Sequence, residues 1–384
     1  MPMIPYGRQN ISQEDIQSVV AVLESDFLTQ GPQVPAFEKS MADYCQAQFA
    51  LAVNSATSAL HIACLALGVG KGDRAWTTPN TFVASANCAL YCGADVDFVD
   101  IDPVTFNLCP LALEKKLLQA ARDNCLPKVI IPVHFSGLPC DMQAIKQLAD
   151  QYQIKIIEDA SHAVGGKYLG NPVGHCEFSD ITVFSFHPVK IVTTAEGGMA
   201  LTNQPELAEK MALYRSHGVT RDPDLMQGES DGPWYYQQVD LGLNYRMTEL
   251  QAALGLSQVT RLDQFVSKRH QIADRYDQLL SSLDVVSPTR TEQSYSGLHL
   301  YVIQVPAEKR LSLFKYLRAE GVGVNVHYIP VHTQPYYKEM GFKSGDFPVS
   351  ETYYSQAISL PMFPDLSQQD QDFVVQKLAE GLCR

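Results

Sequence analysis

Strand and helix patterns alternate through the first half of this sequence, and no other feature limits its fold so strongly. Short apolar runs typical of buried strands occupy residues 49–53, 95–99, 128–133, 155–157 and 181–186. Helical patterns lie between them, for example at residues 58–67 and 142–152. Because strands that alternate with helices usually pair in parallel and are covered on both faces, we expect an α/β fold built on a mostly parallel sheet.

The pattern changes after about residue 246. It predicts a long helix at residues 248–265, a strand at 298–305, a helix at 311–320, a strand at 322–327 and a closing helix from about Ser367. We therefore predict a large domain over residues 1–255, whose N-terminal segment starts its first helix at Ser12. A smaller C-terminal α+β domain is expected over residues 256–384.

Charge and cysteine content exclude several classes of protein. The formal net charge of −13 makes the chain a poor general binder of nucleic acid or of an anionic membrane. The longest apolar stretch, residues 59–69, is shorter than the ~20 residues that span a bilayer, and the N-terminus does not read as a signal peptide. The nine cysteines are scattered without a CxxC, which indicates reduced thiols and no metal site. We expect a cytoplasmic protein.

An acidic residue ends one of the predicted strands. Asp159 follows the apolar run at residues 155–157, and ligands in parallel sheets bind outside the carboxyl ends of the strands. A carboxylate there could face the ring nitrogen of pyridoxal phosphate and keep it protonated, so that the ring withdraws electrons. The alternative is that Asp159 only caps the following turn, as aspartates often do.

Lys190 follows the strand at residues 181–186 and precedes the glycine pair Gly197–Gly198. A lysine that forms a Schiff base must be a free amine part of the time, so its pKa must lie below the usual ~10.4. Most lysines are instead solvated surface charges, and Lys190 alone is a weak signal.

A third segment, residues 54–60, lies between a strand and a helix. Its small residues leave backbone N–H groups open at the helix start, where the helix dipole favours an anion such as a phosphate. An ordinary N-cap by Ser55 or Thr57 is the alternative. The glycines at residues 68–72 follow a helix rather than a strand, which disfavours a nicotinamide dehydrogenase.

Four segments together carry a resemblance to a known family. They are NSATSALHIACLALGVGKGD at residues 54–73, IIEDASHAVGG at 156–166, VFSFHPVKIVTTAEGG at 183–198 and LGLNYRMTELQAALG at 241–255. In this order, they resemble the pyridoxal-phosphate-dependent sugar aminotransferases of the DegT type. The resemblance implies an aspartate-aminotransferase-like fold, also called fold type I, with pyridoxal 5′-phosphate as cofactor.

The resemblance also implies roles for single residues. Lys190 would bond to the cofactor and move a proton between the cofactor and substrate carbons. Asp159 would pair with the pyridine nitrogen, His162 would lie near the phenolic oxygen, and Phe82 would stack on the ring.

The same family implies a phosphate site and a shared active site. Ala56, Thr57 and Ser185 would hold the cofactor phosphate. Asn244 would reach the phosphate bound by a neighbouring subunit, so the active unit is expected to be a homodimer.

Further segments resemble the branch of the family that serves pseudaminic acid biosynthesis: IPYGRQNIS, SDFLTQGPQV, VNVHYIPVHTQPYY and GDFPVSETYYSQAISLPMFPDLS. This resemblance implies transfer of the amino group of L-glutamate to C4 of UDP-2-acetamido-2,6-dideoxy-β-L-arabino-hex-4-ulose. The implied substrate-binding residues are Tyr6, Asp26, Phe27, Leu28, Thr29, Asn325, Val326, His327 and Tyr328. Three alternatives stay open: core packing of His327 and Tyr328, a transaminase making UDP-4-amino-4-deoxy-L-arabinose or another nucleotide sugar, and a non-catalytic regulatory protein on the same fold.

Overall fold

A seven-stranded sheet forms the centre of the larger unit in the computed structural model, which describes residues 3–384. The strands lie in the order β1 (Phe49–Val53), β9 (Gly198–Thr202), β8 (Ile181–Ser185), β5 (Lys155–Asp159), β4 (Val129–Ile131), β2 (Arg74–Thr77) and β3 (Asp95–Phe98). The pairs from β8 to β3 are parallel, whereas β9 runs antiparallel to both of its neighbours. The prediction of a mostly parallel α/β sheet is confirmed.

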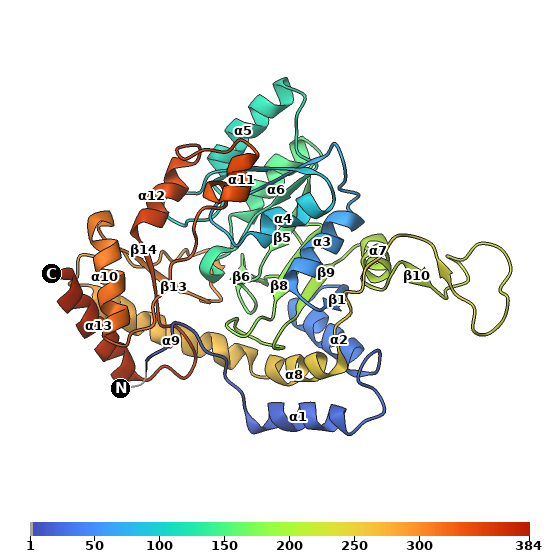
Figure 1. The fold of residues 1–384 in the computed structure, drawn as a ribbon, viewed down its shortest axis with the longest axis horizontal. Helices are drawn as coiled ribbons and strands as arrows, with labels where there is room; N and C mark the ends of the chain where they lie inside the picture. The colour runs from blue at the N-terminus through green and yellow to red at the C-terminus, as the bar shows by residue number, and fades with distance from the viewer. Residues whose placement is uncertain (1–2) are drawn as a thin grey trace.

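Helices cover both faces of this sheet, as Figure 1 shows. The helices of the larger unit are α1 (Gln13–Leu23), α2 (Gln33–Cys45), α3 (Ala56–Ala66), α4 (Ala84–Tyr91), α5 (Pro110–Arg122), α6 (Met142–Gln151), α7 (Pro205–Arg215) and α8 (Glu249–Val259). Side chains alternate across the strands, so Val129 and Ile131 pack with α3, α4 and α7. Ile130 between them faces α5 and α6 on the opposite side. Strands buried on both faces explain the continuous apolar runs in the sequence.

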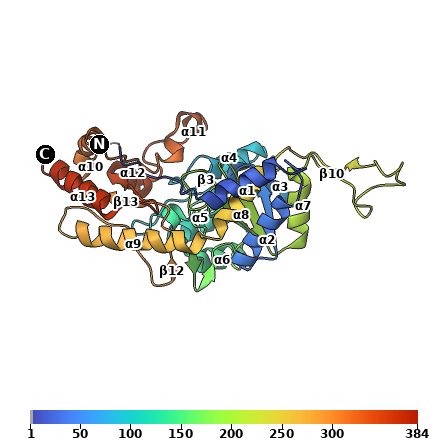
Figure 2. The ribbon, with the colours of Figure 1, turned by 90° about the horizontal axis from the view of Figure 1, so that it is seen from below.

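A smaller unit lies at the end of the long helix α9 (Leu262–Leu280), as Figures 1 and 2 show. Its elements are β13 (Tyr301–Gln304), α10 (Ala307–Ala319), α11 (Pro335–Glu339), α12 (Pro348–Gln356), β14 (Ala357–Leu360) and α13 (Gln368–Leu382). Phe265 of α9 belongs to the core of the larger unit, whereas Ile272 belongs to the core of the smaller one. Because one helix contributes to both cores, the boundary at residues 255/256 stays a prediction.

Short elements complete the chain. They are β6 (Lys167–Tyr168), β7 (Asn171–Pro172), β10 (Val219–Thr220), β11 (Gln237–Gln238), β12 (Ser294–Tyr295) and the 3₁₀ turns η1 (Phe135–Gly137) and η2 (Val331–Thr333). The β10–β11 hairpin extends away from the sheet in both ribbon views (Figures 1 and 2).

The N-terminal segment returns to the smaller unit. Ile4 pairs with Val322, and the backbone N–H of Met362 donates to the carbonyl of Tyr6 at 2.9 Å. This pairing brings Tyr6 beside residues more than 300 positions away in the chain.

The single helix predicted at residues 248–265 is wrong, because the structure has two helices there. α8 ends at Val259 and α9 begins at Leu262. Arg261, between them, donates to Asn10 at 2.6 Å and forms an ion pair with Asp15. These partners lie about 250 residues earlier in the chain, so helical periodicity could not reveal the break.

The strand predicted at residues 322–327 is also wrong. Val322 and Asn325 make only isolated bridges, to Ile4 and to Ser359. The side chain of Asn325 accepts a hydrogen bond from the backbone N–H of Val326 at 2.8 Å, and such local bonds compete with sheet ladders. The sequence reading also missed β2 and β9, whereas the helix start at Ser12 is confirmed by a capping box with Asp15.

Candidate active site

A cavity of about 470 Å³ opens at the carboxyl ends of β5 and β8, a volume typical of small-molecule sites. Its lining includes ten of the residues singled out from the sequence: Tyr6, Ala56, Thr57, Phe82, Asp159, His162, Ser185, Lys190, His327 and Tyr328. The larger unit supplies most of the residues that line the cavity. The smaller unit supplies residues 299, 327 and 328. Residues from both units therefore converge on one cavity.

Asp159 is the last residue of β5 and is buried. The hydroxyl of Ser85 donates to its Oδ2 at 2.6 Å, and the backbone N–H of Ser161 donates to its Oδ1 at 3.1 Å. Over residues 3–384, no basic side chain lies within 4.0 Å of this carboxylate. A buried carboxylate normally has a cationic partner, and a protonated pyridine nitrogen would supply one. Asp159 therefore fits pyridoxal phosphate.

Lys190 lies in the loop between β8 and β9 and lines the same cavity. Burial disfavours its charged form and lowers its pKa to about 8, although the Asp159 carboxylate acts in the opposite direction. At neutral to mildly alkaline pH, an appreciable fraction of this amine is unprotonated and nucleophilic.

The start of α3 forms a cradle suited to a phosphate. Ser55 caps the helix by accepting the N–H of Ser58, and Ala56 and Thr57 begin it at the wall of the cavity. Gly198 pairs with both Val53 and Ser185, which brings the ends of β1 and β8 to the same place. A Cβ atom on Gly198 would lie 2.5 Å from the Ala56 nitrogen, so only glycine permits this approach.

His162 and Tyr328 form a hydrogen-bonded pair across the two units, 2.9 Å apart. The backbone N–H of Ser136 donates to Nδ1 of His162 at 3.2 Å, so a neutral ring carries its proton on Nε2. Burial, with Lys190 and His327 nearby, holds the pKa of His162 well below its usual range. His162 therefore donates to the Tyr328 oxygen, and the Tyr328 proton is free to point into the cavity.

His327 is held in a similar way by its neighbours. The Nδ2 of Asn325 lies 3.4 Å from its Nε2, and Oγ of Ser359 lies 2.7 Å from its Nδ1. Since Oδ1 of Asn325 already accepts a backbone N–H, Nδ2 acts as the donor and leaves the ring proton on Nδ1. Burial and the nearby Lys190 lower the pKa of His327 to about 3. The imidazole is therefore neutral, with Nδ1 donating to Ser359 and Nε2 accepting from Asn325.

Several predicted residues lie outside the lining of this cavity. Asp26, Phe27, Leu28 and Thr29 are exposed beside α8, where the N–H of Glu249 donates to the Leu28 carbonyl at 3.0 Å. Asn244 is exposed, with its carbonyl 3.5 Å from the Asn54 amide. Asn325 and Val326 precede His327 in the chain and do not line the cavity. Phe82 does line the cavity but is 59% exposed, so one ring face is open.

Residues that the sequence reading missed support the site. Ser85 binds Asp159, and Oδ1 of Asn80 accepts the N–H of Tyr328 at 3.3 Å. His299 lines the cavity 4.5 Å from the His162 ring, and its Nδ1 is buried without a hydrogen-bond partner among the described residues. A predicted strand at residues 298–305 contained His299, but no local pattern could relate it to His162.

The end of β5, which carries Asp159, is held in place by hydrogen bonds of the preceding residue, Glu158. Oε2 of Glu158 lies 2.7 Å from Nε2 of His134, and the hydroxyl of Ser179 donates to Oε1 at 2.5 Å. Burial raises the pKa of Glu158, but these hydrogen bonds outweigh it and hold the pKa below its usual value. These hydrogen bonds restrain the end of β5 and so keep Asp159 in a fixed position.

No group of three or more potential ligand side chains suited to a metal ion occurs within residues 3–384. Over the same residues, none of the helices is long and apolar enough to cross a membrane.

Known proteins resemble this chain over almost its whole length. The model of the DegT/DnrJ/EryC1/StrS aminotransferase family matches residues 9–379. A Campylobacter jejuni protein named UDP-4-amino-4,6-dideoxy-N-acetyl-beta-L-altrosamine transaminase is 36% identical over 394 residues, covering 99% of this chain and 100% of its own.

Solved structures have the same fold. PseC of Helicobacter pylori, described as an aminotransferase involved in the biosynthesis of pseudoaminic acid, has a TM-score of 0.91 and 30% identity, covering 99% of both chains. Spr1654 of Streptococcus pneumoniae, solved in a PLP-form, has a TM-score of 0.90 and 29% identity, covering 99% of this chain and 98% of its own.

Proposed function

Because the chain belongs to the DegT/DnrJ/EryC1/StrS aminotransferase family and is a pyridoxal-phosphate-dependent sugar aminotransferase, we propose that it acts on a UDP-linked amino sugar. The reaction moves the amino group of L-glutamate to C4 of UDP-2-acetamido-2,6-dideoxy-β-L-arabino-hex-4-ulose. The product is UDP-4-amino-4,6-dideoxy-N-acetyl-β-L-altrosamine, an intermediate of pseudaminic acid biosynthesis. The enzyme works in the cytoplasm, where its nine free thiols stay reduced.

The observation that carries this proposal is the convergence of three groups on one cavity. Lys190 supplies an amine with a pKa of about 8, Asp159 supplies a buried carboxylate, and the start of α3 supplies open N–H groups. A regulatory protein without catalysis has no need of an amine tuned in this way. The choice of sugar rests on the relatives at 36% and 30% identity.

Pyridoxal phosphate, when bound, supplies an aldehyde that takes up an amino group and a ring that withdraws electrons from the neighbouring carbon. Asp159 would hold the proton on the ring nitrogen, because no basic side chain of residues 3–384 lies within 4.0 Å of its carboxylate. Ala56, Thr57 and Ser185 would hold the phosphate, and Phe82 would cover one face of the ring. These residues fix the orientation of the reacting carbon.

Lys190 then acts as the proton carrier. Its Nζ is unprotonated part of the time, so it can take a proton from the donor's α-carbon. It later returns a proton to C4 of the sugar. His162 positions the Tyr328 hydroxyl, whose proton points into the cavity beside the reacting atoms. Neutral His162 and His327 add no positive charge that would compete with Lys190 for the proton.

Two assays test this function. The first follows the visible absorbance of the cofactor-loaded enzyme, which L-glutamate should bleach in the absence of any sugar. The second compares kcat/KM for the purified 2-acetamido-6-deoxy-4-keto sugar and for the UDP-4-keto pentose. Preference for the hexose supports the proposal. Preference for the pentose would assign the chain to UDP-4-amino-4-deoxy-L-arabinose formation, and the absence of bleaching would reject transamination.

The proposal includes a homodimer with shared sites. Asn244 is exposed and lies outside the cavity of its own chain, so it is available to hold the phosphate bound by a second copy. Residues 26–29 are exposed as well and could reach sugar in the neighbouring site. Mixing inactive Lys190→Ala chains with weakened Asn244→Ala chains should restore part of the activity in heterodimers. Full activity in a monomer at assay concentration would exclude shared sites.

A further inference from the structure

Three thiols meet where α3 packs against α4, outside the active cavity. Cys64 belongs to α3, Cys88 belongs to α4, and Cys92 caps the C-terminus of α4. Cys64 and Cys88 are buried in one apolar cluster, and Cys92 packs against that cluster while staying partly exposed. The Cys64 thiol lies within hydrogen-bonding reach of both other thiols. None of the three lines the active cavity, so the cofactor chemistry does not use them.

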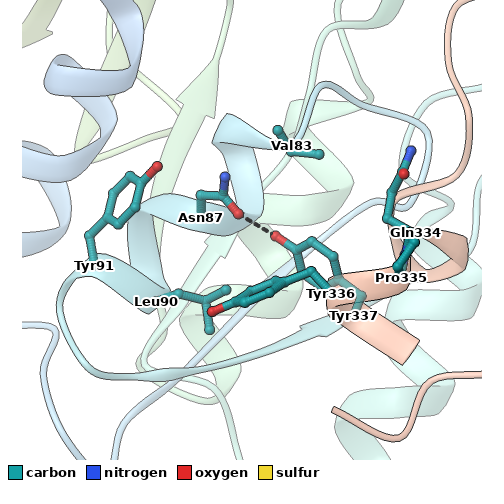
Figure 3. Close-up of a pocket in the computed structure, with 8 residues that line it drawn as sticks. All are labelled: Val83, Asn87, Leu90, Tyr91, Gln334, Pro335, Tyr336 and Tyr337. Atoms are coloured by element: carbon teal, nitrogen blue, oxygen red, sulfur yellow. Dashed lines mark hydrogen bonds between the residues drawn. The ribbon is translucent and has the colours of Figure 1, made fainter. Parts of the chain in front are cut away.

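Helix α4 turns one face to the smaller unit and another to α3. Figure 3 shows Asn87 and Tyr91 at the pocket between α4 and α11, where the hydroxyl of Tyr337 donates to Oδ1 of Asn87 at 2.6 Å. Cys88 and Cys92 are four residues apart, so they share a second face of the helix. Because Cys88 packs in one cluster with residues of α3, this second face is the one toward α3. Tyr91 is 55% exposed, so solvent reaches the end of α4 next to Cys92.

Cys92 is the thiol of this cluster that is best placed to react with a solute. Cys64 and His61 both donate to its sulfur and lower its pKa to about 6, although burial acts in the opposite direction. Nδ1 of His61 lies 3.1 Å from the hydroxyl of Tyr245, which holds the ring in place. At neutral pH most of Cys92 is therefore thiolate. An accessible thiolate beside a second thiol is the arrangement that reacts with peroxides.

Cys64, rather than Cys88, is the partner with which Cys92 can form a disulfide. A disulfide needs Cβ atoms about 3.5–4.5 Å apart, whereas helical residues four apart hold theirs about 5–6 Å apart. Cys88 and Cys92 therefore cannot pair unless α4 unwinds. Cys64 lies on another helix, and α4 ends at Cys92, where the following Gly93 has a φ of +77°. The end of α4 can thus move toward α3 while the hydrogen bonds of its interior stay intact.

We propose that Cys92 and Cys64 form a redox-responsive pair, which a peroxide oxidises to a disulfide between α4 and α3. The Cys92 thiolate attacks one peroxide oxygen and becomes a sulfenic acid, while the O–O bond breaks and the other oxygen leaves and takes up a proton. The sulfur of Cys64 then attacks that of Cys92, and the Cys64 proton leaves with the sulfenic hydroxyl as water. Two thiols and one peroxide thus give a disulfide, water and an alcohol or a second water. A dithiol reductant returns both residues to thiols and becomes a disulfide itself.

The disulfide would connect two helices whose first turns border the active cavity. Ala56 and Thr57 open α3 at the wall of the cavity, and the hydroxyl of Ser85, near the start of α4, donates to Asp159 at 2.6 Å. Disulfides in cytosolic proteins are usually transient and redox-sensing, which suits a pair that rests as thiols. The inference does not depend on the choice of sugar.

The test treats the cofactor-loaded enzyme with hydrogen peroxide, blocks the remaining thiols with N-ethylmaleimide and maps linked peptides by mass spectrometry. The wild type should give a peptide pair linked through Cys64 and Cys92, which dithiothreitol releases. Cys64→Ala should stop at a sulfenic acid on Cys92 that dimedone traps, and Cys92→Ser should leave Cys64 reduced. Cys88→Ala and Cys383→Ser are the matched controls, at a buried and an exposed cysteine, and should form the link as the wild type does.

The wild type alone can overturn the inference, whatever the folding of the variants. A link from Cys92 to Cys88, a sulfinic acid on Cys92 while Cys64 stays reduced, or oxidation confined to Cys383 would each contradict the pair. Alkylation of Cys92 by iodoacetamide should have its midpoint near pH 6, and a midpoint near that of Cys383 would contradict the activated thiolate. Bleaching by L-glutamate is measured on the reduced enzyme, so its absence would reject transamination and leave the thiol pair intact.

Discussion

The two walls of the active cavity are constructed in different ways. The proposed cofactor wall consists of Ala56, Thr57, Asp159, Ser185 and Lys190, which follow or end strands of one sheet. The proposed substrate wall consists of Tyr6, His299, His327 and Tyr328, which belong to the N-terminal segment and the smaller unit. Strand register fixes the first wall, whereas the second depends on contacts between units, such as that of Tyr328 with His162.

This difference has a functional consequence. The cofactor chemistry is common to the family, so it benefits from a rigid frame in which Asp159 and Ser185 come from neighbouring strands. Substrate choice varies between enzymes, and it is assigned here to segments that can change without disturbing the sheet. Substitutions on the cofactor wall should therefore abolish both half-reactions, and those on the substrate wall should act mainly on the sugar.

The largest effect is expected from Lys190→Ala. Without the amine, no group in the cavity can bond to the cofactor and carry the proton, so turnover should be abolished. Bleaching of the cofactor absorbance by L-glutamate measures the first half-reaction directly. Lys167→Ala, at an exposed lysine of β6, is the control and should behave as the wild type. Bleaching at the normal rate in Lys190→Ala would contradict the assignment.

Asp159→Asn should retain cofactor but lower kcat by about 10²–10³-fold, the cost of removing one group that stabilises developing charge. The amide keeps the shape and the bond with Ser85 but cannot hold a proton on the ring nitrogen. Both half-reactions should slow equally, as expected for the cofactor wall. Asp150→Asn, at an exposed helical ion pair with Lys146, is the control. Near-normal turnover of cofactor-loaded Asp159→Asn enzyme would reject this role.

Tyr328→Phe should lower kcat/KM for the sugar by about 10- to 100-fold, because Nε2 of His162 loses its acceptor and the cavity loses a donor. Tyr353→Phe is the matched comparison, since its hydroxyl donates to the His327 carbonyl at 2.8 Å rather than to the cavity. It should reduce stability and change kcat/KM little. Equal kinetic losses in both variants would mean that Tyr328 acts only through packing.

The pH dependence of cofactor uptake should follow Lys190. Only the free amine bonds to the aldehyde, so with a pKa of about 8 the rate should rise about tenfold between pH 7 and pH 9. The rate of absorbance change on adding pyridoxal phosphate to cofactor-free enzyme gives the midpoint, with N-acetyl-lysine as the reference amine. Because the Asp159 carboxylate raises this pKa, Asp159→Asn should shift the midpoint to lower pH. A midpoint near that of the reference amine would contradict the effect of burial.

The smallest effect is expected from His327→Ala, which should raise the barrier for the sugar by about 1–3 kcal/mol if one polar group of the substrate is left unpaired. The glutamate half-reaction should change less, because the imidazole belongs to the substrate wall. Measuring both half-reactions in single turnovers separates the two. If both half-reactions slowed equally, His327 would not act on the sugar alone, and its place in the proposed substrate wall would be contradicted.

The sequence by itself determined the class of the sheet, mostly parallel and covered by helices, and the strand ends that carry the proposed cofactor wall, although it did not reveal β2 and β9. Continuous apolar runs gave β1, β5 and β8 to within a few residues, because strands buried on both faces need little tertiary information to be recognised. Asp159 and Lys190 could be singled out because each follows such a strand directly. Their roles, and those of the other predicted site residues, remain predictions that the variants above test.

Only the tertiary structure decided which groups surround those residues. Ser85 binds Asp159 from 74 positions away, and Tyr328 binds His162 from 166 positions away. The break between α8 and α9 likewise depends on Arg261 reaching Asp15. Periodicity records only whether a residue faces the core or solvent, so it carries no information on which distant residue it meets. The pairing of the two units therefore set the direction of the Tyr328 hydroxyl and the shape of the active cavity.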